Sequence, residues 1–238
     1  MFEKTASFGA VSFYPMTNVI FIFSGGTLDD HFAEGALKQN PGAKIIAADR
    51  GLEAAERLGI RPDFIIGDFD SASEEAVKEA YAAAEKYGTQ IRRLNPVKDD
   101  TDTEAAVKAA NELYPGPGTI YILGGTGTRL DHVLGNLSIL GMGYTYGKDI
   151  ILMDPHNRAR MYFPGTYTMR REDFFGTYVS FFPIGEPVAG LTLSGFKYPL
   201  SEAVLHGLST LAVSNEAKEE EETISFRSGR LLMIESKD

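Results

Sequence analysis

The sequence predicts an α/β protein: an N-terminal part with a mostly parallel sheet and helices on both faces, then a C-terminal antiparallel β-sandwich. From Val19 to Met153, short apolar runs alternate with helix-like segments, a spacing typical of parallel strands joined by helices. After Asp154-Pro155 the helical periodicity fades, and short segments rich in Gly, Pro, Thr, Tyr and Phe follow, which favour a sandwich or barrel. We therefore expect two domains, at residues 1–154 and 155–238.

Each expected strand of the first domain is a short apolar run that ends at a glycine or a polar turn. The segments between the strands are longer and mix Ala, Glu, Leu and Lys, as amphipathic helices do. The expected strands are Val19–Phe23, Lys44–Ala48, Phe64–Ile66, Gln90–Leu94, Thr119–Leu123 and Ile150–Met153. The expected helices are Asp29–Lys38, Leu52–Leu58, Ser73–Tyr87, Thr101 or Asp102 to Tyr114, and His132–Gly141.

The second domain is expected to consist of strands alone. Ser228-Gly229 is a turn signal that predicts a hairpin between the last two strands. The expected strands are Ala159–Phe163, Thr166–Arg170, Tyr178–Phe182, Leu191–Leu193, Thr210–Val213, Thr223–Arg227 and Leu231–Glu235.

The composition narrows the class of function. The chain has 33 acidic and 23 basic residues, a formal charge of −10, and no basic run, so we expect no nucleic acid or anionic membrane as a partner. No apolar run approaches the roughly 20 residues that span a bilayer, and the first residues do not resemble a secretory signal. Cysteine is absent, which is compatible with a cytoplasmic enzyme.

An acidic turn follows the strand expected at Phe64–Ile66. Asp68 and Asp70 stand two residues apart, so in extended chain their carboxylates face the same side. Two such charges repel each other unless a cation lies between them, and Mg²⁺ with oxygen ligands would relieve that repulsion. The alternative is a turn in which Ser71 caps the next helix, because Ser71 and Glu74 have capping-box spacing.

A second acidic cluster, Lys98 to Glu104, follows the fourth expected strand. Asp99 and Asp102 are three residues apart and could present both carboxylates on one side, with Lys98 beside them. A cation next to a carboxylate pair suits a metal-bound triphosphate. The plainer interpretation is a helix start, because Thr101 and Glu104 also have capping-box spacing.

A glycine-rich segment, Gly124 to Gly127, follows the fifth expected strand and precedes a helix. Its backbone amides, which include those of Gly125 and Thr126, could approach an anion closely. Arg129 could add a bidentate phosphate contact, whereas His132 alone would usually be a structural histidine. Asp131 could instead be a helix N-cap. The segment matches neither the Walker motif nor the dinucleotide-binding glycine pattern.

Asp49-Arg50-Gly51 follows the second expected strand and could be an ordinary turn with a helix start. It is, however, one of four polar loops that each follow a strand. In a parallel sheet all four loops lie at the same edge, where α/β proteins bind ligands. One phosphate and metal site explains this arrangement better than four unrelated turns do, so we expect an enzyme.

These motifs, in this order, resemble the thiamine pyrophosphokinase (thiamine diphosphokinase) family over about residues 19 to 235. The combination of the two acidic motifs is the most specific part of the resemblance. The matching segments are Asp49-x-Gly51, Gly67-Asp68-Phe69-Asp70-Ser71, Lys98-Asp99-x-Thr101-Asp102-x-Glu104, Gly127-x-Arg129-x-Asp131-His132, Gly195-Phe196-Lys197-Tyr198-x-Leu200 and Ser214-Asn215-Glu216.

The resemblance implies a nucleotide-binding catalytic domain, a thiamine-binding β-sandwich, and a homodimer with thiamine near the subunit interface. It also implies transfer of the diphosphate of ATP to the hydroxyl of thiamine, with Mg²⁺ as cofactor and AMP as the second product. The implied metal ligands are Asp68, Asp70, and Asp99 or Asp102. The implied ATP-binding residues are Asp49, Arg50, Lys98, Gly125, Thr126, Arg129 and His132. Asp131 would assist the hydroxyl, and Tyr198, Ser214 and Asn215 would bind thiamine.

The sequence departs from the family pattern at two places. Some relatives have Trp at the position of Tyr198, whereas this chain has no Trp, and Arg50 replaces the more usual Gly. Three alternatives remain open. The pattern Asp68-x-Asp70 also resembles phosphatases of the haloacid dehalogenase type, in which the first Asp forms an aspartyl-phosphate. The second alternative is a non-catalytic sensor, which would lack some of the acidic residues. The third is an enzyme that transfers the diphosphate to a different alcohol.

Overall fold

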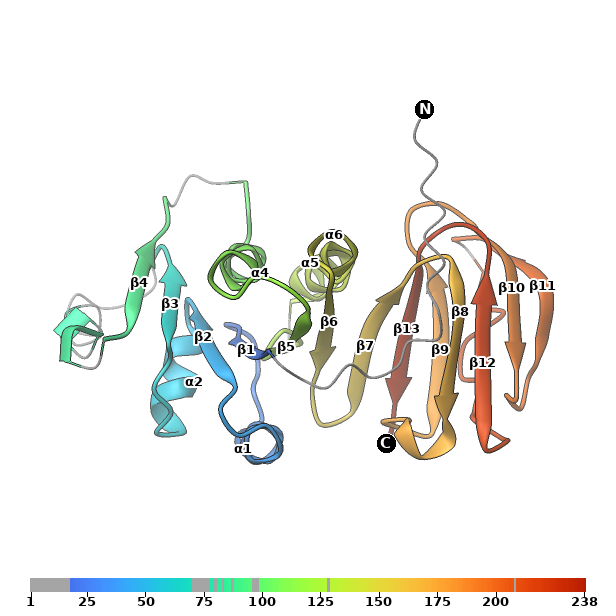
Figure 1. The fold of residues 1–238 in the computed structure, drawn as a ribbon, viewed down its shortest axis with the longest axis horizontal. Coiled ribbons are helices and arrows are strands. Elements are labelled where there is room, and N and C mark those ends of the chain that lie inside the picture. Colours follow the sequence, from blue (N-terminus) through green and yellow to red (C-terminus); the bar gives the residue numbers. More distant parts are fainter. Residues whose placement is uncertain are drawn as a thin grey trace. The chain divides into compact units, whose positions relative to one another are not determined.

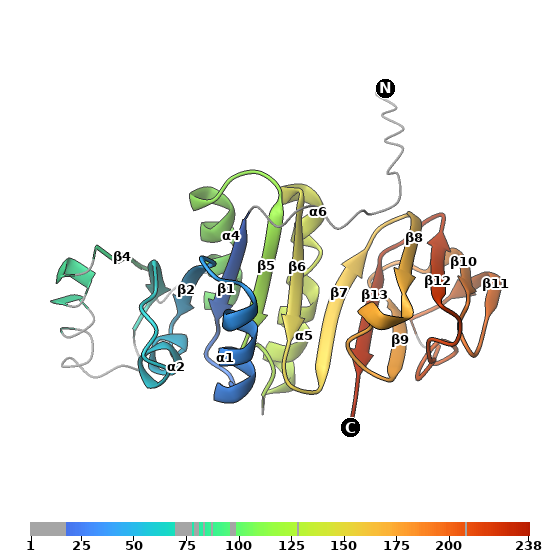
Figure 2. The ribbon, with the colours of Figure 1, turned by 60° about the horizontal axis from the view of Figure 1, so that its bottom comes forward.

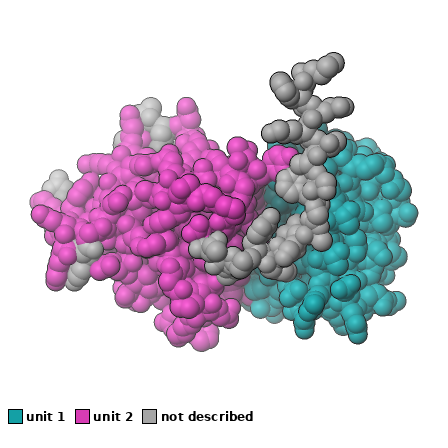
Figure 3. Space-filling model, in the orientation of Figure 1, with its two compact units in different colours: residues 1–15, 156–238 teal, residues 16–155 magenta. Residues whose placement is uncertain are grey.

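The computed structural model (Figure 1) describes residues 18–69, 78, 81–82, 84–86, 88–95, 99–127, 129–207 and 209–238. The chain forms two compact units that divide between Pro155 and His156 (Figure 3). No helix of the described residues is long and apolar enough to cross a membrane. Asp70, Ser71 and Lys98 lie outside the described residues. So does most of the expected helix Ser73–Tyr87.

The N-terminal unit, residues 16–155 (magenta in Figure 3), contains a parallel sheet with the strand order β4-β3-β2-β1-β5-β6. Every neighbouring pair in this order is parallel, so the expected parallel sheet is confirmed. The strands are β1 (Val19–Phe23), β2 (Lys44–Ala48), β3 (Phe64–Gly67), β4 (Gln90–Arg93), β5 (Gly118–Leu123) and β6 (Lys148–Met153). Parallel pairing brings their carboxyl ends to one edge of the sheet.

Helices cover both faces of this sheet, as Figures 1 and 2 show: α1 and α2 lie on one face, and α4, α5 and α6 on the other. The helices are α1 (Asp30–Gln39), α2 (Gly51–Arg57), α4 (Asp102–Leu113), α5 (Leu130–Ile139) and α6 (Met142–Tyr146). Because successive strand residues face opposite sides, Phe21 and Phe23 pack with Ala33 of α1 and Ala55 of α2. The helix α6, which begins soon after α5 ends, was not anticipated.

The ends of the helices follow local rules. The Asp29 carboxylate accepts a hydrogen bond from the Phe32 amide at 2.7 Å and caps α1. Thr101 accepts one from the Glu104 amide at 3.2 Å and caps α4, so the helix start predicted there is confirmed. The N-cap of α5 is Arg129, and the interpretation of Asp131 as the cap is therefore wrong.

The C-terminal unit, described over residues 156–238 apart from residue 208 (teal in Figure 3), is a β-sandwich of antiparallel strands. One sheet has the order β7-β13-β9 and the other β11-β10-β12-β8. Their inner faces bury a shared apolar core that includes Val179, Phe181, Leu191, Ile224 and Leu231. The strands are β7 (Asn157–Tyr162), β8 (Gly165–Arg170), β9 (Tyr178–Pro183), β10 (Val188–Ser194), β11 (Leu200–Leu205), β12 (Glu221–Phe226) and β13 (Leu231–Ser236).

Two expectations for the sandwich are wrong. Ser228-Gly229 does not close a hairpin, because β12 pairs with β8 and β10 whereas β13 pairs with β7 and β9. The segment instead carries the chain from one sheet to the other. Thr210–Val213 is not a strand: the Val213 amide donates to Thr210 within a turn. The strand β11 was not predicted from the sequence. It lies at the edge of its sheet, where among the described strands it pairs with β10 in a register that shifts twice. The apolar–polar alternation of such an edge strand is weak.

Two glutamates of the sandwich are fully buried but differ in their partners. The Glu235 carboxylate accepts hydrogen bonds from Arg158 Nε at 2.6 Å, from Arg158 Nη2 at 2.5 Å and from the Phe175 amide at 2.9 Å. Glu222 lies on the same face of β12 as the core residue Ile224 and has no hydrogen-bond partner for either carboxylate oxygen. The amides of Lys218 and Glu219 lie beside it but donate to the carbonyl of Gly195.

The substitution Glu222→Gln is expected to stabilise the sandwich at neutral pH by about 1 kcal/mol, because it removes a buried charge without partners. Burial raises the pKa of Glu222 above its ordinary value. A pKa higher in the folded than in the unfolded protein means that the free energy of unfolding falls as pH rises through it. Denaturant titrations should therefore show a higher free energy of unfolding for Glu222→Gln than for the parent at neutral pH, and this difference should disappear in mild acid. Glu235→Gln is the matched control, and it should lower the free energy of unfolding, because it leaves Arg158 without its charged partner.

Candidate active site

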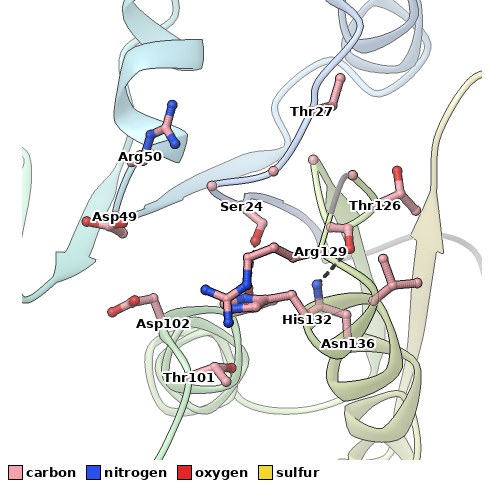
Figure 4. A pocket seen from close by; sticks show the side chains of 17 residues that line it. Ser24, Thr27, Asp49, Arg50, Thr101, Asp102, Thr126, Arg129, His132 and Asn136 are labelled. Atoms are coloured by element: carbon pink, nitrogen blue, oxygen red, sulfur yellow. Dashed lines mark hydrogen bonds between the residues drawn. The ribbon is translucent and has the colours of Figure 1, made fainter. Parts of the chain in front are cut away.

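A pocket of about 520 Å³ lies at the carboxyl edge of the parallel sheet. Its walls come from the loops after β1, β2 and β5 and from the starts of α4 and α5 (Figure 4). These walls are residues 24–27, 49–50, 101–103, 124–127, Arg129, His132, Val133 and Asn136. The prediction that loops after successive strands would meet at one edge holds for these segments.

The pocket brings together many of the residues that the sequence singled out. They are Asp49, Arg50, Asp102, Gly125, Thr126, Arg129 and His132. Three further candidates, Asp68, Asp99 and Asp131, are described but do not line this pocket. The candidates Asp70 and Lys98 lie outside the described residues. Tyr198, Ser214 and Asn215 belong to the sandwich unit, residues 156–238.

The loop Ser24–Thr27 was not anticipated as part of the site. It is joined to the loop after β5 by backbone hydrogen bonds from Ser24 N to Leu123 O at 2.8 Å, from Gly26 N to Gly124 O at 2.8 Å, and from Thr27 N to Thr126 O at 3.1 Å. At Gly26 a Cβ atom would lie 2.4 Å from the Gly124 oxygen, so only glycine permits this approach. The signal was present, since Ser24-Gly25-Gly26 also follows a strand.

The loop after β2 is shaped by tight backbone contacts. Asp49 has a left-handed conformation, with φ of 48°, and its amide donates to the Ile66 carbonyl at 2.8 Å. A Cβ atom at Gly51 would lie 1.9 Å from the Phe23 oxygen, so α2 can begin beside β1 only with glycine there. Arg50, which precedes this glycine, lines the pocket and makes a 3.6 Å ion pair with Glu53 at the surface.

Arg129 and Asp131 form an exposed ion pair beside the pocket. Arg129 Nε lies 3.2 Å from Asp131 Oδ1, and Arg129 Nη2 lies 2.5 Å from Asp131 Oδ2. The neighbouring Arg129 guanidinium lowers the pKa of Asp131 to about 2, and the His132 amide, which donates to the same carboxylate, adds to the effect. Asp131 therefore keeps its negative charge throughout the neutral range and, while paired, is a weak proton acceptor.

In the sandwich, the residues expected to contact the vitamin differ in exposure. Tyr198 is 56% exposed. Asn215 is buried, and its side chain is used by the backbone: Oδ1 accepts from the Tyr198 and Glu216 amides, both at 2.9 Å, and Nδ2 donates to the Tyr198 carbonyl at 2.8 Å. Asn215 thus holds the segment that carries Tyr198. Ser214 has φ of 56°, and its amide donates to Ser180.

The carboxylates of the pocket are compatible with magnesium. Among the described residues, no three His, Asp or Glu side chains gather closely enough to form a metal cage. Mg²⁺ does not need one, because it commonly retains several waters and binds one or two carboxylates together with substrate phosphates. Asp49 and Asp102 both line the pocket and supply hard oxygen donors of the kind that this ion prefers.

Two protein-family models match this chain, one in each structural unit. The model of the thiamin pyrophosphokinase catalytic domain matches residues 39–152, and that of the thiamin pyrophosphokinase vitamin B1 binding domain matches residues 166–231. A thiamine pyrophosphokinase of Bacillus subtilis (strain 168) is 37% identical over 193 residues, which cover 81% of this chain and 87% of the relative.

Solved structures of the same kind are also similar. A crystal structure of thiamine pyrophosphokinase from Bacillus subtilis has a TM-score of 0.80 and 34% identity, with 93% of this chain and 100% of that chain covered. A crystal structure of thiamin pyrophosphokinase from Geobacillus thermodenitrificans has a TM-score of 0.74 and 34% identity, with 92% of this chain and 98% of that chain covered.

The parallel sheet with a polar pocket at its edge, together with an antiparallel sandwich in the same chain, defines a two-part α/β enzyme. The family matches extend over both parts and occur in the same order along the chain. The chain belongs to the thiamine pyrophosphokinase family.

Proposed function

We propose that this enzyme transfers the terminal diphosphate of ATP to the hydroxyl of thiamine, giving thiamine diphosphate and AMP, in a reaction that depends on Mg²⁺. The observation that carries the proposal is the position of the pocket, which lies at the edge of the parallel sheet and mostly within the region matched by the catalytic-domain model. Its walls combine glycine-rich backbone with Arg129, His132, Asp49 and Asp102, groups suited to phosphates and to a hard cation.

In this reaction the thiamine hydroxyl oxygen forms a bond to the β-phosphorus of ATP. The bond from that phosphorus to the oxygen bridging to the α-phosphate breaks, and AMP leaves with that oxygen. Such transfers need alignment and charge neutralisation more than covalent help. Arg129 and His132 would bind phosphate oxygens, and Asp131 would accept the hydroxyl proton. A bound Mg²⁺ would neutralise phosphate charge.

We propose further roles for residues outside the pocket and for the two domains. Asp68 and Asp99, together with Asp70, would hold the metal, and Lys98 would hold phosphate. Residues 1–154 would form the nucleotide-binding catalytic domain and residues 155–238 the thiamine-binding domain, where Tyr198 would face the vitamin. A homodimer with thiamine near the subunit interface rests on the family resemblance. A cytoplasmic location stays a prediction.

The test is a product assay with ATP, Mg²⁺ and thiamine that follows AMP and thiamine diphosphate together. Equal amounts of both products are expected. Asp102→Asn, which removes a pocket carboxylate, should lower kcat/KM by about 100-fold, as is common when a transition-state charge contact is lost. Asp100→Asn is the matched control, because Asp100 pairs with Lys108 at 2.7 Å and does not line the pocket. ADP or free phosphate as the product would contradict the proposal.

A further inference from the structure

Three successive carbonyl groups of the loop after β5 are bound by donors from the protein. Gly124 O accepts from the Gly26 amide at 2.8 Å, and Thr126 O accepts from the Thr27 amide at 3.1 Å. Gly125 O, between them, accepts from the side-chain Nδ2 of Asn136 at 2.7 Å, the contact marked by the dashed line in Figure 4. All three carbonyls are thereby fixed in direction.

The amides that belong to the same three peptide groups are not used by the protein. Within the described part of the chain, the amides of Gly125, Thr126 and Gly127 have no hydrogen-bond acceptor. A trans peptide is planar, with its N–H directed opposite to its C=O. Donors that hold the carbonyls therefore also set the directions of the amides, and all three of these residues line the pocket. Successive unpaired amides of this kind form anion-binding concavities.

Asn136 is the only side chain among these three donors, and it is well placed to act as a fixed support. It is 5% exposed and lies on α5, where Asn136 and Ile139 are the buried residues. The peptide that it holds has little room to move, because a Cβ atom at Gly125 would lie 2.4 Å from Leu152 Cδ1. This role could not be predicted from the sequence, since a lone Asn one turn beyond His132 belongs to no local motif.

We propose that Asn136 is a positioning residue for the polyphosphate of the nucleotide. By holding Gly125 O, it orients the Thr126 amide, and with it the row of three amides, toward phosphate oxygens. This inference rests on the proposed function, because it takes the nucleotide to be the ligand of the pocket. The role is distinct from catalysis: Asn136 acts through the loop, which it keeps ready before the ligand arrives.

The test compares binding of Mg²⁺–ATP and of inorganic tripolyphosphate to three variants by calorimetry, without thiamine. Asn136→Leu keeps a similar volume but has no donor, so we expect its affinity for both ligands to fall roughly tenfold. The KM for ATP should rise to match, while the KM for thiamine stays as in the parent. Ser138→Ala is the matched control on the same helix, because the Ser138 hydroxyl bonds only to Leu134 O at 2.9 Å.

Asn136→Asp supplies a second readout that a merely structural role would not change. An ionised Asp cannot donate to Gly125 O, whereas a protonated one can. In mild acid this variant should therefore bind tripolyphosphate more tightly than Asn136→Leu at the same pH. Parent-like affinity in folded Asn136→Leu, or no difference between the two variants in acid, would overturn the inference while leaving the proposed function intact. Failure of the parent protein to bind Mg²⁺–ATP would overturn both.

Discussion

Gly26→Ala is expected to lower kcat/KM for ATP by about 100-fold or more, equivalent to about 3 kcal/mol of lost transition-state binding. An added Cβ would lie 2.4 Å from Gly124 O and 2.5 Å from Thr126 O, closer than real Cβ atoms approach oxygen. The loops after β1 and β5 must then separate, which breaks the bonds that fix Gly124 O and Thr126 O. Steady-state kinetics with varied ATP would measure the loss.

Gly35→Ala is the control for this substitution. Gly35 lies within α1, and a Cβ atom there would meet nothing within 4 Å. Alanine within a helix is favoured over glycine by about 0.5–1 kcal/mol where its Cβ has room, so this variant should be slightly more stable and fully active. Unchanged kinetics for Gly26→Ala would show that the joined loops do not shape the nucleotide site, and would remove the basis for a fixed row of amides.

The contrast between these glycines explains which parts of the site could be predicted from the sequence. Loops at strand ends are visible as local patterns, and Asp49, Asp102 and Gly125 were identified because each stands in such a loop or at the helix start that follows it. The contacts of Gly26 with Gly124 and of Asn136 with Gly125 join residues that belong to different structural elements, 98 and 11 positions apart. No local pattern of a single sequence records a pairing of that kind.

The same distinction holds for the fold. The parallel strands were predicted well because a strand buried on both faces is a continuous apolar run, as Ile20 to Phe23 are. Ser228-Gly229 was misinterpreted because a turn signal describes the local backbone and not which sheet the next strand joins. The family assignment also decides against the phosphatase alternative, which had rested on the short pattern Asp68-x-Asp70 alone.

Asp131→Asn is expected to lower kcat by at least about 100-fold, the usual contribution of a general base, while the dissociation constant for Mg²⁺–ATP changes little. The reason lies in its ion pair. Arg129 holds the pKa of Asp131 at about 2, so the paired carboxylate accepts protons weakly. Arg129 lines the pocket, whereas Asp131 does not. If Arg129 turned to a bound phosphate, Asp131 would lose its cationic partner, its pKa would rise, and it would become a stronger base.

This coupling can be separated from a simpler role in which Asp131 only orients Arg129. In that case Asp131→Asn would weaken Mg²⁺–ATP binding as much as it slows turnover, and equal losses would rule out the base role. Glu53→Gln is the matched control, because Glu53 pairs with the other pocket arginine, Arg50, at 3.6 Å without lining the pocket. Both ion pairs are exposed and contribute little to stability, so a loss of turnover in Asp131→Asn that Glu53→Gln does not show, together with unchanged Mg²⁺–ATP binding, would come from chemistry at the Asp131 carboxylate.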